Sequence, residues 1–390
     1  MYDCVVVGCG YAGAVSARLL AEQYGKTVLI LERRDHIAGN MFDYYDENGI
    51  LIHKYGPHIS VMNHDDVYNF LSRFTDWIPY EHRVNVEIDG KEVPLPINFN
   101  SIEHLFSSEK ANLLITRLND MYRHDSTVPI LELMNSKDET IRSFANFIYD
   151  KVFFHYTMKM WGLSPDKIDK AVTGRIPIRL SRDDRHFLHK YQVMPREGFT
   201  RLFKNMIEHP NIDIRLSIAA DKAVEIDFGT GNIKVFGEKF DGIVVYTGAL
   251  DELMNYKYGQ LPYRSLRFQN EFLNADYIQA TPVLNWPDDR PATRRTEMKR
   301  LTQQVVQGKT VTITEFPGGY VSGSKDFSEP FYPISEKSCL DLYKKYLYDI
   351  EKISRLIPTG RLADYKYYNM EDTILNTLAV IKKWERIIKR

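Results

Sequence analysis

Residues 3–20, DCVVVGCGYAGAVSARLL, decide the fold of this chain. Residues 5–7 are β-branched and apolar, as in a strand, and three glycines and an alanine-rich helical pattern follow them. A second apolar run, TVLILE at 27–32, ends in Glu32, an acid roughly 20 residues after the glycines. Strand, glycine turn, helix, strand and acid in this order predict a Rossmann-like dinucleotide-binding unit.

Each glycine has its own expected task. Gly8 makes the tight turn, Gly10 lets the backbone approach a pyrophosphate, and Gly13 lets the helix pack closely on the strand. The helix N-terminus then faces the phosphates, and Glu32 accepts a hydrogen bond from a ribose hydroxyl. The alternative is a glycine-rich turn that holds no ligand.

The residues after Glu32 distinguish nicotinamide from flavin cofactors. RRDHIAGN at 33–40, a basic pair followed by small residues and an asparagine, resembles the continuation found in FAD proteins of the amine-oxidase type. The sequence has no second GxGxxG for a separate nicotinamide domain. Cys4 and Cys9 fall in the predicted strand and turn, so a flavin disulfide reductase is not expected. FAD is the predicted cofactor.

Composition excludes several other classes of protein. The 390 residues carry 51 basic and 52 acidic side chains, a balance that argues against a general nucleic-acid or polybasic membrane surface. The N-terminus does not resemble a signal peptide and no apolar run is long enough to span a membrane, so we expect a cytoplasmic protein. Cys4 and Cys9 would lie about 16 Å apart in a strand, too far for a disulfide. No metal site is predicted.

The pattern along the chain predicts an α/β protein in which a Rossmann-like FAD-binding domain carries a helical insertion and an antiparallel β-sheet substrate domain. Residues 84–97 are expected to form a hairpin that turns at Asp89 and Gly90. The expected segments are 1–75, 196–261 and 335–390 for the FAD-binding domain, 98–174 for the helical domain, and 76–97, 175–195 and 262–334 for the sheet domain.

The residues alone leave the role of two kinds of stretch undecided. FFHYTMKMWG at 153–162 fits either a buried amphipathic helix or a platform on which a flat ligand stacks. Residues 173–187 and 290–300 are arginine-rich, and each fits either a solvated face or a diphosphate site, because arginine binds phosphate bidentately. Near the C-terminus, residues 369–372 predict the cap of a closing helix.

A series of segments then points to one family. In chain order they are GCGYAGAV, ERRDHIAGN, HKYGPHI, LPIN, HYTMKMWG, GRIPIR, MPREGFT, YTGALDE, YRSLRF, TRRTE, FYPI and GRLADYKYYNM. Together they resemble the bacterial UDP-galactopyranose mutase family over essentially the whole chain. The resemblance implies an isomerase, an intramolecular transferase, that interconverts the pyranose and furanose forms of a nucleotide sugar and is active with reduced FAD. It also implies an external reductant such as NAD(P)H, a homodimer, and a place in the synthesis of a cell-surface polysaccharide or another glycoconjugate.

The same resemblance implies roles by position. Arg175 and Arg294 would clamp the diphosphate and His58 would lie beside the flavin, so these three are the implied catalytic residues. The implied substrate-binding residues are Phe153, Tyr156, Trp161, His82, His186, Asn285, Phe316, Tyr332, Tyr367 and Asn369. The implied cofactor-binding residues are Gly8, Gly10, Tyr11, Ala12, Gly13, Glu32, Arg33, Gly39, Asn40, His58, Gly360, Arg361, Asn369 and Met370. In this family N5 of reduced flavin attacks the anomeric carbon, the nucleoside diphosphate leaves, and the sugar ring opens and recloses.

The chain departs from the family pattern around the sugar and phosphates. Where the family has histidine, asparagine and tyrosine, this chain has Val61, His82 and His186; further changes are Ala292, Met298 and Phe316. Losing a hydrogen-bonding partner relaxes or inverts a preference for a hydroxyl. The changes predict a sugar with a smaller or less polar C5 substituent, such as UDP-arabinopyranose or dTDP-fucopyranose, beside the first expectation, UDP-galactopyranose.

Two other classes of protein remain alternatives. An FAD-dependent oxidoreductase of the amine-oxidase type would share the N-terminal pattern but oxidise its substrate. A non-catalytic nucleotide-binding protein would fit the lost polar positions.

Overall fold

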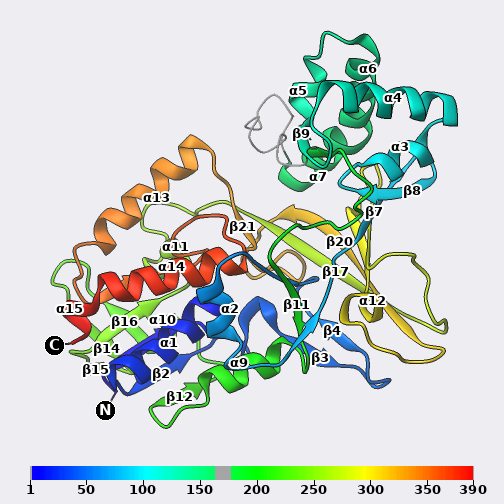
Figure 1. The fold of residues 1–390 in the computed structure, drawn as a ribbon. Helices are drawn as coiled ribbons and strands as arrows, with labels where there is room; N and C mark the ends of the chain where they lie inside the picture. The colour runs from blue at the N-terminus through cyan, green and yellow to red at the C-terminus, as the bar shows by residue number, and fades with distance from the viewer. Residues whose placement is uncertain (1, 163–176, 390) are drawn as a thin grey trace.

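A five-stranded parallel sheet carries the N-terminal unit (Figure 1). The computed structural model describes residues 2–162 and 177–389, apart from the side chains of His155 and Trp161. The strands lie in the order β12 (Ile212–Arg215), β2 (Val28–Leu31), β1 (Cys4–Val7), β16 (Ile243–Tyr246) and β22 (Leu356–Pro358), and every neighbouring pair is parallel. The sheet therefore joins segments from three distant parts of the chain, and the Rossmann-like fold is confirmed.

The central strands are buried on both faces, which explains their unbroken apolar runs. Cys4 and Val6 of β1 belong to one core cluster, and Val5 and Val7 belong to the cluster on the opposite face. The first face is covered by α1 (Tyr11–Tyr24), α9 (Phe199–Ile207) and α14 (Met370–Lys383). The second is covered by α11 (Leu250–Leu253), α13 (Lys337–Ile350) and the small sheet of β13 (Val224–Ile226), β14 (Ile233–Val235) and β15 (Glu238–Lys239).

A seven-stranded sheet forms the second layer of the molecule. Its order is β21 (Tyr332–Pro333), β17 (Tyr263–Leu273), β20 (Thr310–Gly319), β19 (Arg294–Glu297), β18 (Val283–Asn285), β7 (Val84–Ile88) and β8 (Lys91–Leu95). The pairing is antiparallel except between β18 and β7, which run parallel. The predicted hairpin is present: Asp89 and Gly90 both have positive φ, as a tight two-residue turn requires.

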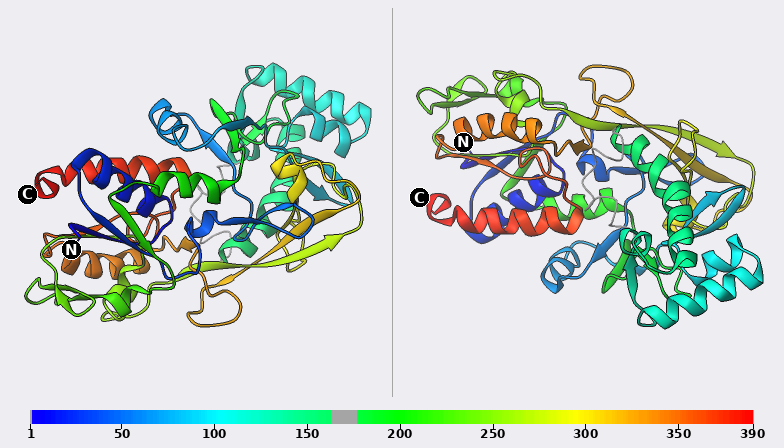
Figure 2. Two further views of the ribbon diagram at one scale, coloured as in Figure 1. Left: turned by 90° about the horizontal axis from the view of Figure 1, so that it is seen from below. Right: turned by 90° about the horizontal axis from the view of Figure 1, so that it is seen from above.

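The helical segment packs against the β7–β8 end of this sheet. It consists of α3 (Phe99–Leu105), α4 (Ser108–Met121), α5 (Ile130–Met134), α6 (Glu139–Ile148), the π-helical turn η2 (Tyr149–Phe154) and α7 (His155–Trp161). Its core includes Leu114, Phe144 and Ile148 together with Val84 and Val86 of β7. The views in Figures 1 and 2 show this helical group far from both chain termini, which lie at the Rossmann end.

The strands within residues 177–195 lie outside the seven-stranded sheet. Strand β10 (Pro177–Arg179) pairs with β9 (Thr127–Pro129) of the helical segment. Strand β11 (Tyr191–Pro195) lies between β5 (Ser60–Met62) and β6 (Trp77–Pro79). The apolar side chains explain both placements, because Ile178 is buried in the helical core and Met194 in the core against the Rossmann sheet.

The remaining elements connect these layers. They are η1 (Gly39–Met41), β3 (Asp43–Tyr45), β4 (Leu51–His53), α2 (Asp65–Leu71), α10 (Ala220–Ala223), α12 (Met298–Thr302) and α15 (Glu385–Ile388). In the part of the chain that the structure describes, no helix combines the length and apolar character needed to cross a membrane.

Candidate functional site

Two cavities meet beside the Rossmann sheet. The first, of about 590 Å³, opens at the carboxyl ends of β1, β2 and β16, where α/β folds bind their ligands. The second, of about 410 Å³, lies between the seven-stranded sheet, the helical segment and the loop before α14. Asn40, His58, Arg361 and Met370 line both cavities, so a ligand in one cavity lies next to a ligand in the other.

The glycine turn has the shape that was expected of it. Gly8 has φ +96, in the left-handed region, and a Cβ at Gly13 would lie 1.9 Å from the Gly8 carbonyl oxygen, so only glycine allows this approach of helix to strand. A Cβ at Gly10 would meet nothing within 4 Å. Gly10 is also the N-cap of α1 and provides no side-chain cap, which leaves the first N–H groups of the helix available to an anion.

Glu32 is buried behind the turn and lines the first cavity. Its Oε2 accepts a hydrogen bond from the Cys9 N–H at 2.8 Å, and its Oε1 accepts one from the Arg34 N–H at 3.0 Å. Arg33 and Arg34 both reach Glu329 at 2.6 Å, and Arg34 also donates to Asn40 at 2.8 Å. Sequence reasoning missed Arg34 and Glu329, because the two residues are 295 positions apart.

The residues predicted for the cofactor form one continuous lining, and they fit FAD. Gly39 and Gly360 shape it by close approach: a Cβ at Gly39 would lie 2.9 Å from Gly10 Cα, and one at Gly360 would lie 2.8 Å from Ala12 Cβ. Two predicted residues do not line the first cavity, since Gly13 is under the turn and Asn369 faces the second cavity. The others do: Gly8, Gly10, Tyr11, Ala12, Glu32, Arg33, Gly39, Asn40, His58, Gly360, Arg361 and Met370.

Polar side chains enter the second cavity from three directions. Asn285 and Arg294 are paired residues of β18 and β19, and Tyr156 comes from α7. The C-terminal side contributes Tyr332, Tyr367 and Asn369. Asn369 was expected to cap α14, and its side chain does accept a hydrogen bond from the Asp372 N–H.

Arg294 is the cation that β19 presents to this cavity. Its Nε lies 2.8 Å from Glu315 Oε1, and Glu315 is buried. Burial lowers the pKa of the Arg294 guanidinium, but Glu315, Tyr156 and Tyr332 together raise it by more, so the pKa lies above its ordinary value. Among the described lining residues, Arg294 and Arg361 are the only arginines, and no lysine is present.

Three histidines complete the wall, of which His82 is buried and His58 and His186 are half-buried. Burial lowers the pKa of His82 and of His186, and it lowers the pKa of His58 to about 3, so all three rings are neutral at pH 7. His186 Nδ1 lies 2.9 Å from the Leu95 carbonyl oxygen, which identifies this nitrogen as the donor. His82 Nδ1 lies 2.9 Å from the Tyr80 hydroxyl. The histidines offer hydrogen bonds to a ligand, but no positive charge.

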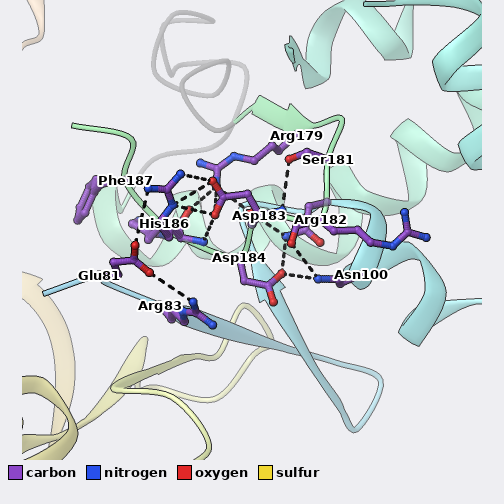
Figure 3. Close-up of polar contacts among 12 residues, drawn as sticks. Glu81, Arg83, Asn100, Arg179, Ser181, Arg182, Asp183, Asp184, His186 and Phe187 are labelled. Atoms are coloured by element: carbon purple, nitrogen blue, oxygen red, sulfur yellow. Dashed lines mark hydrogen bonds and ion pairs between the residues drawn. The ribbon is translucent and has the colours of Figure 1, made fainter. Parts of the chain in front are cut away.

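The first arginine cluster mainly holds the backbone together. Arg179 donates to the carbonyl oxygens of Asp183, at 2.9 Å, and Arg185. Arg185 in turn pairs with Asp183 at 2.7 Å (Figure 3). Arg182 pairs with Glu103. Three of the cluster's four arginines are thus used inside this network, and the fourth, Arg175, lies outside the described residues.

A second set of contacts attaches this network to α3. Asp184 Oδ1 accepts hydrogen bonds from the Asn98 and Asn100 side chains at 2.8 and 2.9 Å. Arg179 and the Asp184 contacts hold the loop that leads from β10 to His186 (Figure 3). The His186 backbone N–H donates to the His82 carbonyl oxygen. The network therefore positions two of the histidines of the cavity wall.

The second arginine cluster sends one residue to a cavity. Arg290 pairs with Glu87 at 2.8 Å, Arg295 donates to Gln279 at 2.6 Å, and Arg300 lies 3.5 Å from Glu297. Lys299 is buried and donates to the Val306 carbonyl. Arg294 alone among these lines the cavity.

Not every predicted substrate residue reaches the second cavity. Phe153 is 3% exposed and packs in the helical core instead. Phe316 follows Glu315 on β20, so its ring turns to the opposite face, where it packs with Trp286 under Arg267. The side chain of Trp161 is outside the described part of the structure. The residues that the cavity does bring together are His58, Tyr156, His82, His186, Asn285, Arg294, Tyr332, Tyr367 and Asn369.

Comparisons with known proteins agree on one family. The family model described as UDP-galactopyranose mutase matches residues 151–367, and the model of an NAD(P)-binding Rossmann-like domain matches residues 6–74. The chain is 34% identical to UDP-galactopyranose mutase of Mycoplasma pneumoniae, over 97% of this chain and 95% of that protein. It is 33% identical to dTDP-fucopyranose mutase of Escherichia coli, over 95% of both.

A solved structure gives the same answer for the fold. The crystal structure of reduced UDP-galactopyranose mutase superposes with a TM-score of 0.73 at 18% identity, covering 99% of this chain and 94% of that one. The family match spans more than half of the chain, and the sequence relatives extend over nearly all of it. By these matches, this chain belongs to the UDP-galactopyranose mutase family.

Proposed function

We propose that this protein is an FAD-dependent mutase that interconverts the pyranose and furanose forms of a nucleotide sugar. Membership of the family confirms the predicted cofactor, FAD, and the predicted class of enzyme. The observation that carries the proposal for the site is the junction of the two cavities, where Asn40, His58, Arg361 and Met370 line both. A flavin in the first cavity and a sugar in the second would then be in contact.

The lining of the second cavity supports chemistry by the cofactor rather than by a side chain. Its described residues include no carboxylate, thiol, lysine or aliphatic hydroxyl. A pair of carboxylates, the usual equipment for cleaving a glycosidic bond, is therefore missing from this part of the wall. When bound and reduced, FAD supplies the nucleophile for the anomeric carbon.

The chain's own residues would bind and orient the substrate. Arg294 is held by Glu315 and offers a fixed guanidinium to the diphosphate, which is also the leaving group. Tyr332 and Tyr367 lie with ring centroids 5.4 Å apart, and Arg361 lies 5.6 Å from the Tyr332 ring. These groups would receive the phosphates next to Arg294, and Tyr156 with Asn285 would receive the base. We propose the same diphosphate role for Arg175.

The sugar is the finer part of the proposal. Relatives named for UDP-galactopyranose and for dTDP-fucopyranose are similar to this chain to nearly the same degree, so identity does not choose between them. The wall beside the neutral histidines is apolar and includes Val61 and Phe187. We propose UDP-galactopyranose or a close analogue with a less polar C5 substituent, UDP-arabinopyranose or dTDP-fucopyranose.

Proton NMR of the FAD-loaded protein tests the function. The protein is incubated without oxygen with UDP-galactofuranose, UDP-arabinofuranose or dTDP-fucofuranose, each with and without dithionite. We expect conversion to the pyranose only in the reduced samples. Failure with all three sugars would contradict the mutase proposal, and net oxidation of a sugar would instead favour the amine-oxidase type of oxidoreductase. A clear preference for galactose would rule out the arabinose and fucose nucleotides as the preferred substrates.

Four further expectations belong to this proposal. NAD(P)H is the expected physiological reductant, tested by anaerobic bleaching of the flavin absorbance. Sedimentation tests the expected homodimer. Cell fractionation tests the expected cytoplasmic location, and loss of a furanose-containing polysaccharide on deletion tests the pathway.

A further inference from the structure

A lysine ties the helical segment to the hairpin that carries two polar residues of the second cavity. Lys159 lies on α7, and its Nζ donates to three carbonyl oxygens, those of Trp286 at 2.6 Å, Ala292 at 3.0 Å and Arg290 at 3.1 Å. An ammonium group has three N–H donors, so these contacts use all of them.

The three carbonyls belong to one loop, and the residues at either end of that loop line the second cavity. Residues 286–293 connect β18 to β19, and the last pair in register before the loop is Asn285 with Arg294. Both side chains line the second cavity. The position of the loop therefore sets where the amide and the guanidinium point.

On the other side of the contact, α7 is held in place next to the second cavity. Tyr156 precedes Lys159 by three residues on α7, so the two lie on neighbouring positions of one helix face, and Tyr156 lines the same cavity. Arg264 of β17 holds the helix from the other side: its Nε donates to the Met160 carbonyl at 2.7 Å and its Nη2 to the Lys159 carbonyl at 2.9 Å. A Cβ at Gly162, which has φ +65, would lie 2.8 Å from Arg264 Nη1.

The loop has its own ties to the sheet, but none of these reaches the helix. Glu87 of β7 accepts a hydrogen bond from Trp286 Nε1 at 3.1 Å and pairs with Arg290 at 2.8 Å. Those contacts hold the loop to the sheet, whereas Lys159 holds it to α7.

We infer that Lys159 is a positioning residue for nucleotide binding, which fixes Tyr156 of the helical segment against Asn285 and Arg294 of the sheet. The inference rests on the proposed function, since it names the nucleotide part of the substrate as the ligand of these three residues. Loss of the ammonium group would leave three carbonyl oxygens without their donor and let the two walls separate.

Binding of UDP and of dTDP tests the inference without turnover. In calorimetry on the FAD-loaded protein, Lys159→Met should weaken nucleotide binding about tenfold, the effect of losing roughly one charged hydrogen-bonding group. In the mutase assay the same variant should raise KM more than it lowers kcat, because the contacts of Tyr156 and Asn285 with the base are common to ground state and transition state.

Chemical rescue separates positioning from general damage to the fold. Lys159→Ala lacks the propylammonium part of the side chain, so added propylammonium should restore much of the affinity for UDP, whereas propan-1-ol, an uncharged molecule of the same length, should not. The matched control is Lys151→Met: Lys151 lies on the same helical segment but pairs with Asp89 at 2.7 Å, away from the cavity. It should bind nucleotides as the wild type does.

A pH series on the wild-type protein covers the case in which the variants fail to fold. Burial lowers the pKa of Lys159 to about 8; Asp288 and Asp289 raise it, and Arg290 lowers it. The ammonium group thus loses a proton, and one of its three donors, as the pH rises through about 8. Affinity for UDP should fall from pH 7 to pH 9.

Each outcome decides the inference. It is overturned by wild-type affinity in Lys159→Met, by a flat pH series, or by a wild-type protein that binds neither nucleotide. A protein that binds UDP through Lys159 but converts no sugar would support the inference and contradict the proposed function.

Discussion

Arg294 and Glu315 face each other in register on β19 and β20, and Arg294 Nε lies 2.8 Å from Glu315 Oε1. The carboxylate is 1% exposed, so the guanidinium is anchored from behind by a partner that a ligand cannot reach. Because a guanidinium has five donors, one such anchor leaves it able to bind a diphosphate as well.

Arg294→Lys should lower kcat/KM by roughly 10- to 100-fold, because lysine keeps the charge but loses the planar fork that binds a phosphate group bidentately. Steady-state kinetics of the reduced enzyme measures the effect. Arg300→Lys is the matched control, since Arg300 belongs to the same basic cluster but contacts Glu297 and Tyr277. Equal losses in both variants would contradict the role of Arg294.

Substituting alanine for two glycines of the turn should have different effects. Gly13→Ala places a Cβ 1.9 Å from the Gly8 carbonyl oxygen, so the helix must move, and we expect destabilisation by several kcal/mol. Gly10→Ala meets no protein atom within 4 Å, but its methyl group occupies the first cavity. We expect that variant to fold normally and to lose FAD.

Thermal unfolding and the flavin absorbance of the purified proteins separate the two effects. A Gly10→Ala protein that keeps a full complement of FAD would show that the pyrophosphate does not approach this turn.

The stability of the protein should fall in acid partly through His58. Burial, His53 and Arg361 lower its pKa to about 3 from the ordinary 6.5. A lowered pKa means that His58 contributes stability that is fully present above about pH 6.5 and is lost as the pH falls toward 3. Each pKa unit of difference between the folded and unfolded states is worth about 1.4 kcal/mol.

Urea unfolding between pH 7 and pH 4, at saturating FAD, measures this loss. In His58→Phe the free energy of unfolding should depend less steeply on pH than in the wild type. His124→Phe, at an exposed position of the helical segment, should leave the slope unchanged. Identical slopes in all three proteins would mean that His58 is not kept neutral.

The contribution of Asp364 to stability should change with pH in the opposite direction to that of His58. Burial raises its pKa to about 6, although the Gly360 N–H and the Asn376 side chain donate to its Oδ2 at 3.1 and 2.7 Å. A raised pKa means that its favourable contribution is present below the unfolded value of 3.8 and is lost as the pH rises through about 6.

At pH 7 the free energy of unfolding of Asp364→Asn, measured with urea, should therefore exceed that of the wild type by up to about 3 kcal/mol. Near pH 4 the two free energies should be similar. The exposed Asp341 provides the control, Asp341→Asn, for which no such gain is expected. A less stable Asp364→Asn protein at pH 7 would show that the charged carboxylate is needed beneath the loop of Gly360.

Local patterns were enough for the Rossmann unit, the first hairpin of the sheet and the cofactor. The order of strand, glycines, helix and acid led to the Rossmann unit, and the Asp89–Gly90 pair led to the hairpin, because each depends on residues close together in the chain. Local patterns did not indicate partners for β10 and β11, because short strands have no local signal for a partner, and burial of Ile178 and Met194 decided the pairing.

Local patterns did not indicate which aromatic residues face the cavity. Phe153 and Tyr156 are three residues apart in one aromatic stretch, yet Phe153 is buried in the helical core and Tyr156 lines the cavity. The stretch at 153–162 thus lies partly in the helical core and partly along the second cavity: Phe153 belongs to the π-helical turn that ends at Phe154, and Tyr156 belongs to α7, which follows it.

By itself, the sequence determined the Rossmann unit, the FAD cofactor and the family, since these rest on residue types at short spacings and on the order of segments. Only the tertiary structure decided which arginine of the second cluster lines a cavity. Arg294, Arg295 and Arg300 look alike in the sequence, but their partners Glu315, Gln279 and Glu297 come from different strands and loops. The partner that a buried charge finds determines whether it faces a ligand or holds the fold, and folding brings those partners together from distant positions.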